Sequence, residues 1–409
     1  MASNATKASD VNPRVRGLFL KNVGDFQTEM ARLIAGFIPA LVVWRQRKEL
    51  PSLVFRSLRR VQDLRLRSRE LGVSFAEMHF SASVAGRALV DPLCHAATAA
   101  DLLAGAMITV YGTLIAAIDD DLKRNEGVYD LPSVALLEAD RDELQWQVAW
   151  AQMALRELQE AAGERPNESW LIKIETLCAD LPKTLGQHNV RGTVGAKAGR
   201  RIGVLPFADA RLPLGFHHLE FGPEPLAAAA DYAERARYHA TNFLQEVQAA
   251  DSCASMLFES PDLPWEFYFD LSRHMWDEAR HAMFGEAKLL ELGTDAATAG
   301  LSTKAYALRQ TLAALDRYAA LSTQEADAFP GKHAGLKDAM AHNDALSAKA
   351  WSYDIADETQ HLRFGTKWIP VMMEKTGEPR SYEQVKEDAC NWRASVLAEG
   401  YKPAAATFR

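Results

Sequence analysis

Cysteine is scarce in this chain of 409 residues, which contains only Cys94, Cys178, Cys253 and Cys390. No two of them form a Cys-x-x-Cys pair, so neither a disulfide framework nor a thiolate zinc site is expected. Widely spaced single cysteines are typical of proteins in the reducing cytoplasm, where we expect this one. The first residues are polar and lack the apolar core of a signal peptide.

A large excess of one charge is also missing. The chain has 46 basic and 54 acidic residues and a net charge of −8. Such a chain has no general attraction for nucleic acid or anionic lipid, so we expect neither as a partner. Hydrophobic residues at 48% and charged residues at 24% are typical of a soluble globular protein, and the length suggests two domains.

Long apolar runs are few. One uncharged stretch, residues 102–118, reaches the lower edge of membrane-span length. It contains glycine, threonine and tyrosine, and acidic residues bound it on both sides. We therefore interpret it as a buried central helix, with a membrane span as the alternative, and predict no membrane association.

Alternating β-branched patterns long enough for a sheet are absent, which predicts an all-α protein. Helices are expected at roughly 24–48, 51–72, 96–124, 131–162, 227–258, 264–292, 302–328 and 343–374. We predict a helical domain over 1–190, a linker or active-site cover over 191–226, a four-helix bundle over 227–374 and an extension over 375–409. The cover is rich in glycine and proline and also carries Arg191, Lys197, Arg200, Arg201 and Arg211. We interpret these charges as solvated, with binding of an anionic substrate as the alternative.

Two expected helices carry the same pattern, Asp-Glu-x-x-His, at 277–281 and 357–361. Residues three apart share a helix face, so each glutamate and histidine can converge on one metal ion. Two copies should occur by accident in about one such chain in a thousand. The alternative is a pair of surface ion pairs, which have no reason to repeat in register.

A dinuclear site needs one more carboxylate from each of the other two helices. Glu246 fits, because its midpoint with Glu278 falls inside the compact turn at 259–264. Glu325 lies a similar distance before Glu358, but Phe329-Pro330-Gly331 follows it and predicts an irregular passage over 332–343. Asp327 and Asp316 are alternatives to Glu325.

The order Glu, Asp-Glu-x-Arg-His, Glu, Asp-Glu-x-x-His resembles the ferritin-like diiron-carboxylate superfamily. The resemblance covers about 227–374, and Gln360 departs from it where arginine often stands. It implies one iron held by Glu246, Glu278 and His281, a second held by Glu325, Glu358 and His361, and one or two bridging glutamates. Mixed imidazole and carboxylate ligands suit iron or manganese better than structural zinc.

Several neighbours would support such a site. Asp277 and Asp357 are placed to accept a hydrogen bond from a ligand histidine, often one on the other motif. His239 and His274 share faces with ligands; we expect hydrogen-bonded core histidines, with a third ligand as the alternative. Tyr318 and Phe243 are candidate pocket residues, although aromatic residues at this spacing are usually core.

The N-terminal half offers no comparable set. An offset of 132 maps Glu246, Glu278 and His281 onto Leu114, Trp146 and Ala149, as in a degenerate bundle whose ligands became apolar.

The resemblance favours an O2-dependent diiron oxygenase or oxidase acting on a small organic substrate by hydroxylation, N-oxygenation, desaturation or oxidative cleavage. The cofactors would be two iron ions, or manganese, with O2 as co-substrate and a ferredoxin and reductase as electron donor. Alternatives are iron or peroxide handling and a helical interaction protein with a vestigial site. A homodimer through an apolar helix face is compatible with the sequence.

Overall fold

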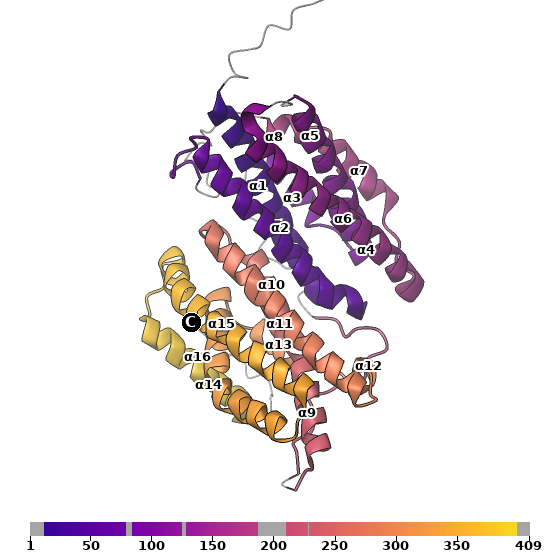
Figure 1. Ribbon diagram of the computed structural model, residues 1–409, viewed down its shortest axis with the longest axis vertical. Coiled ribbons are helices and arrows are strands. Elements are labelled where there is room, and N and C mark those ends of the chain that lie inside the picture. Colours follow the sequence, from indigo (N-terminus) through magenta and orange to yellow (C-terminus); the bar gives the residue numbers. More distant parts are fainter. Residues whose placement is uncertain (1–11, 79–83, 125–127, 187–209, 228, 399–409) are drawn as a thin grey trace, which may run out of the picture. The chain divides into compact units, whose positions relative to one another are not determined.

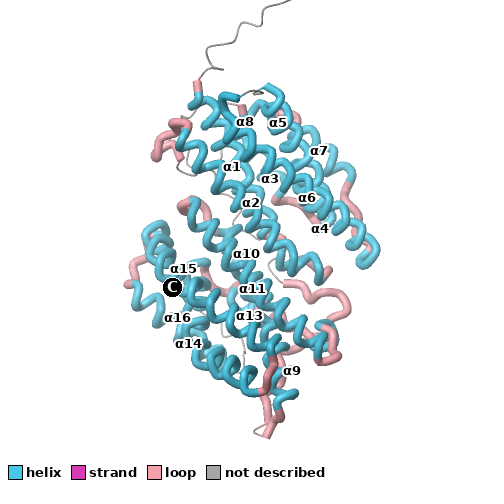
Figure 2. Tube along the Cα trace, in the orientation of Figure 1, coloured by secondary structure: helices cyan, strands magenta, loops and turns pink. Residues whose placement is uncertain are grey.

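The computed structural model describes residues 12–78, 84–124, 128–186, 210–227 and 229–398. Figures 1 and 2 show helices joined by loops, and the described residues contain no strand, only an isolated bridge between His218 and Leu301. The expected all-α class is therefore confirmed. The basic residues expected in the cover lie outside the described residues, except Arg211.

The chain divides into two compact units. Unit one contains the described residues before Ile38 and those from Leu53 to Pro206, and unit two contains Ile38–Ser52 and those from Phe207 onward. The short segment Ile38–Ser52 thus belongs to the second unit, whereas the sequence suggested a single domain over 1–190.

Unit one is built from helices of very different lengths. They are α1 (Pro13–Ala35), most of α2 (Trp44–Glu70), α3 (Val84–Leu93), α4 (Ala99–Leu102), the π-helical η3 (Leu103–Val110), α5 (Tyr111–Arg124), η4 (Val128–Asp130), α6 (Leu131–Ala162), α7 (Glu168–Cys178) and α8 (Leu181–Leu185). Among the described residues, Ala99–Arg124 is the one helical run long and apolar enough to cross a membrane, and 67% of its most apolar window is buried. A buried core helix has the same composition, so the run by itself indicates no span.

The burial pattern gives the offset of 132 between the two halves no support at two of its three positions. Glu278 and His281 are fully buried, but the positions onto which that offset maps them, Trp146 and Ala149, are exposed on α6. The buried face of α6 instead contains Asp140, Leu144 and Gln147. Alanine- and leucine-rich helices align in several registers, and only the burial pattern tells which face is internal.

Unit two contains the helices that carry the repeated motif. They are η2 (Ile38–Ala40), α9 (Tyr232–Gln245), α10 (Val247–Glu259), α11 (Trp265–Glu291), α12 (Ala296–Ala299), α13 (Lys304–Arg309), α14 (Ala314–Ala341), α15 (Ala345–Thr376) and α16 (Tyr382–Ala398). Helices α9 and α10 pack on α11, α14 packs on α15, and α11 packs on α15 (Figure 1). These pairwise contacts join the long helices of unit two.

Two helices of unit two differ from the expected ranges at functional positions. The stretch expected as one helix over 227–258 is instead divided into α9 and α10, with Glu246 as the single residue between them. The irregular passage expected over 332–343 is wrong, because α14 continues through Pro330 to Ala341. Proline removes one helical hydrogen bond, and buried contacts made by Lys332 and Gly335 beyond it hold the helix together.

Close helix packing depends on two glycines that follow the motif histidines by four residues. A Cβ at Gly285 would lie 2.3 Å from the carbonyl oxygen of Ala240 and 2.6 Å from the amide nitrogen of Leu244. A Cβ at Gly365 would lie 2.3 Å from Oγ of Ser322. Glycine thus lets α11 approach the backbone of α9 directly, just before the break at Glu246.

Replacing Gly285 by alanine is expected to lower the free energy of unfolding by about 1–3 kcal/mol, because backbone atoms must move to admit the methyl group. Urea unfolding followed by circular dichroism measures the change. Gly331→Ala is the matched control: it lies in α14 with no atom within 4 Å of its Cβ position. It should be neutral or stabilising by up to about 1 kcal/mol. Equal effects of the two substitutions would contradict the packing argument.

Candidate metal centre

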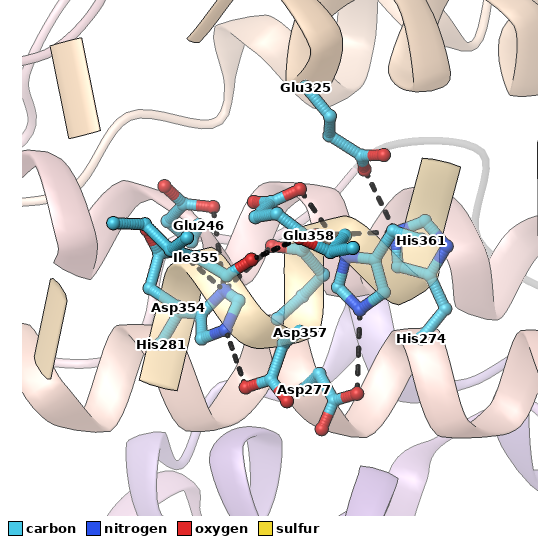
Figure 3. A network of polar contacts seen from close by, with 12 residues as sticks. Glu246, His274, Asp277, His281, Glu325, Asp354, Ile355, Asp357, Glu358 and His361 are labelled. Carbon is cyan, nitrogen blue, oxygen red and sulfur yellow. Dashed lines mark hydrogen bonds and ion pairs between the residues drawn. The ribbon is translucent and has the colours of Figure 1, made fainter. Parts of the chain in front are cut away.

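The two motifs lie on α11 and α15 and direct their glutamates and histidines into the interior of unit two. Glu278, His281, Glu358 and His361 are all buried. Glu246, at the break between α9 and α10, and Glu325, on α14, complete a ring of acidic and imidazole groups around them (Figure 3). All six residues expected as ligands therefore meet in one place.

Their donor atoms form two overlapping groups, each compact enough to hold one ion. Group one consists of Glu246, Glu278, His281 and Glu358, and group two consists of His274, Glu278, Glu325 and His361. Within each group the ligand atoms all lie within 4.8 Å of one another. The described residues contain no other such group.

Group two is centred on two imidazoles whose rings stack with centroids 3.7 Å apart. Nε2 of His274 lies 2.9 Å from a carboxylate oxygen of Glu325 and 3.2 Å from one of Glu278. Nδ1 of His361 lies 3.4 Å from the same oxygen of Glu278. His274 is thus more than a core histidine, and the alternative of a third histidine ligand fits its position.

Group one contains one imidazole. Nδ1 of His281 lies 3.6 Å from Glu278 and 3.9 Å from Glu246. The side chain of Glu246 is 27% exposed, whereas every other member of the two groups is buried. Glu246 is therefore the most solvent-exposed member of the two groups.

The resemblance implied that one or two glutamates bridge the two ions. Glu278 belongs to both groups, and Glu358, which the resemblance assigned to the second ion, belongs to group one. Glu358 contacts Nδ1 of His361 as well, at 3.5 Å. Both glutamates are therefore placed to bridge.

A second layer fixes the outer sides of the two motif histidines. Nε2 of His281 hydrogen-bonds Asp357 at 3.2 Å, and Nε2 of His361 hydrogen-bonds Asp277 at 3.4 Å, each across to the other motif (Figure 3). Arg280 donates to both aspartates. These contacts orient both rings and leave Nδ1 of each facing the interior.

Charge explains why Asp277 stays ionised. Burial alone would raise its pKa, but hydrogen bonds from His361 and Arg273 outweigh burial and lower the pKa to about 2. The same balance appears at Glu278, whose pKa lies well below its usual value because three histidines outweigh the effect of burial.

The motif histidines show the opposite balance. Burial alone would lower the pKa of His281 and His361, but nearby carboxylates outweigh it and raise the pKa of both well above the usual value. The cluster thus strongly attracts positive charge.

Buried polar atoms that make no hydrogen bond also indicate a metal site. Buried polar groups in proteins are nearly always hydrogen-bonded. Here several buried atoms of the two groups make no hydrogen bond: Nδ1 of His281 and of His361, and Oε2 of Glu278, Glu325 and Glu358. Divalent cations held between these atoms would satisfy all of them.

Two further residues at the cluster escaped the sequence analysis. Lys332 on α14 is buried, and its ammonium lies 2.7 Å from Asp354 and 2.8 Å from Glu358. Asp354 also lies 3.4 Å from Nδ1 of His281. Burial opposes ionisation of Lys332, but the charges of Glu246, Glu358 and Asp354 outweigh it and raise the pKa of the lysine. Lys332 was not expected here because the sequence predicted an irregular passage after Pro330. Since α14 continues through this proline, Lys332 lies two helical turns after Glu325, on the same face.

The remaining candidates lie around the cluster or away from it. His239 and Phe243 pack against Trp351 in a hydrophobic cluster. Tyr318 is buried with its ring centroid 6.1 Å from that of His274, and its hydroxyl makes no hydrogen bond. The alternatives to Glu325 point elsewhere: Asp316 pairs with Arg380 and Asp327 with Arg393.

Comparisons of the chain with models of protein families, with curated proteins and with solved structures find no match. The resemblance to diiron-carboxylate proteins therefore rests on the order and spacing of the residues described above. What the cluster can do chemically follows from its donor atoms, their burial and their charges.

Replacing Asp277 by asparagine should weaken binding of divalent metal by about 10–100-fold, because the acceptor that orients His361 loses its negative charge. Equilibrium dialysis with Mn²⁺ measures the change. Asp270→Asn is a control on the same helix, since its carboxylate accepts from Nε1 of Trp368 at 2.9 Å and has no contact with the cluster. If both variants bind metal equally well, Asp277 has no role in holding the ligand.

Proposed function

We propose that unit two holds a dinuclear metal centre and that the protein is an O2-dependent oxidoreductase of the non-haem diiron type. One observation carries the proposal: buried imidazole and carboxylate atoms without hydrogen bonds face one another in two overlapping groups that share Glu278. Such a cluster costs a large amount of free energy unless cations neutralise it.

The donor atoms favour iron or manganese. Structural zinc sites are usually built from cysteine thiolates, and the two groups contain only imidazoles and carboxylates. Ions of calcium or magnesium prefer ligand sets made of oxygen alone, which the three histidines do not match. Iron is preferred over manganese by the resemblance of the motifs.

Bound iron would supply the electrons and the open coordination positions that O2 reduction requires. The chain's own residues do the rest. Asp277 and Asp357 orient the two motif histidines, and Arg280 holds both aspartates. A small organic substrate would approach beside Glu246, the partly exposed ligand, and electrons would come from a ferredoxin–reductase pair or a similar donor.

The first test is anaerobic titration of metal-free protein with Fe²⁺, followed by exposure to O2. We expect two irons per chain and O2 consumption that depends on them. His281→Ala and His361→Ala should each lose at least about tenfold in affinity for one iron, since each removes a buried ligand. His333→Ala, an exposed histidine of α14, is the matched control.

The outcomes separate this proposal from its alternatives. Two irons, lost in the ligand variants and retained in the control, support the diiron centre, and O2 uptake that an organic compound accelerates identifies an oxygenase. Many irons per chain with mineral formation would favour iron handling instead. Absence of bound iron in the unmodified protein would contradict the proposal and favour an interaction protein.

A further inference from the structure

The cluster has an approximate internal two-fold repeat. Residues 277–285 on α11 correspond to residues 357–365 on α15, with Asp-Glu-x-x-His-x-x-Phe-Gly in both. Glu246 on the first helical stretch corresponds in the same way to Glu325 on α14. The hydrogen bonds follow this repeat, because each motif histidine bonds the aspartate of the other motif.

The repeat is broken at several positions, and two of these breaks place different buried ionisable side chains at the cluster. One turn before the glutamate, α11 has His274 while α15 has Asp354. Two turns after the other glutamate, α10 has Cys253 while α14 has Lys332. All four side chains are buried.

The two departures fall on opposite sides of the cluster. His274 contributes an imidazole to group two, and Glu278 and Glu325 lie close enough to Cys253 to add to the effect of burial, which raises the pKa of the thiol. Asp354 and Lys332 both lie at group one, where the ammonium contacts the ligand Glu358 at 2.8 Å and lies 4.0 Å from Glu246. In Figure 3, Asp354 lies beside Glu246 and His281, while His274 lies beside His361 and Glu325.

The chemical consequence is an imbalance between the groups. Group two offers two imidazole nitrogens, which bind divalent transition metals strongly once the metal displaces their protons. Group one has one, and a fixed positive charge touches one of its carboxylates, so an incoming divalent cation is repelled there. The ammonium also balances charge: two divalent ions and one lysine would together neutralise the five carboxylates of the cluster, which are Glu246, Glu278, Glu325, Asp354 and Glu358.

We infer that the two metal positions fill in a fixed order: group two binds the first divalent ion, and group one binds the second against the resident ammonium of Lys332. This inference rests on the proposed metal centre. Lys332 acts as a positioning residue that sets the affinity of group one for metal. Its ion pair with Asp354 keeps that carboxylate from serving as a metal ligand, as His274 would in group two.

Titration of metal-free protein with Co²⁺, followed by optical absorption and by dialysis, tests the order. Two steps of different affinity are expected. His274→Ala should weaken the first step, and Glu246→Gln should weaken the second. Lys332→Met should strengthen the second step by at least about tenfold, because the repulsion is removed and Asp354 becomes available as a ligand. Lys332→Arg should leave the two steps apart.

Controls separate metal effects from folding effects. Lys337→Met removes an exposed lysine of α14 and should leave both steps unchanged. If Lys332→Met does not fold, the double variant Lys332→Met with Asp354→Asn removes both charges of the pair and should still show a strengthened second step. Unfolding in urea checks that each variant is folded.

Two ions bound with equal affinity would overturn the inference while leaving the dinuclear centre in place. A second step that neither Lys332→Met nor the double variant strengthens would overturn the role of Lys332. Failure of the unmodified protein to bind Co²⁺ at all would overturn the proposed metal centre, and the inference with it.

Discussion

Mutual repulsion among buried carboxylates is the constraint on which unit two depends. Glu246, Glu278, Glu325, Asp354 and Glu358 approach one another inside a helical interior, where water screens their charges poorly. Hydrophobic packing alone would not place so many acidic groups together, because each costs free energy to bury. The surrounding cations are therefore part of the architecture: Lys332 inside the cluster, Arg273 and Arg280 outside it, and the metal ions that we propose between the carboxylates.

The helical packing turns this constraint into a defined geometry. Gly285 and Gly365 bring the motif helices against their neighbours, and each is one turn beyond a histidine of the cluster. On α11 this contact lies next to Glu246, the single residue between α9 and α10. The position of Glu246 therefore depends on contacts made by residues that carry no chemistry themselves.

Much of this arrangement could be predicted from sequence, because helix periodicity is local. Glu246 and Glu278 are equally far in sequence from the turn at 259–264. Counting residues is therefore enough to predict that the two carboxylates lie at the same height along the helical hairpin. The rest depends on contacts that periodicity does not contain. Pro330 suggested the end of a helix, but buried contacts of Lys332 and Gly335 carry α14 through it. His274 was only an alternative ligand and Asp354 was not expected at all, because neither belongs to the repeated motif. The packing of α11 on α15 and the contacts of His274 with Glu325 and of Asp354 with Lys332 show that both reach the cluster.

The approximate repeat shows which differences carry chemical meaning. Where the two halves must orient a histidine, they agree: the aspartates, the histidines and the following glycines coincide, and the crossed hydrogen bonds follow. Where a difference would only alter packing, the halves vary freely, as Ala282 and Leu362 illustrate. Two buried differences are of another kind, because they change the charge and the type of metal ligand and not only the packing. They are His274 against Asp354 and Cys253 against Lys332. A symmetric scaffold with unequal charges at its centre gives two neighbouring ions different affinities, and hence different chemical roles, without requiring two different folds.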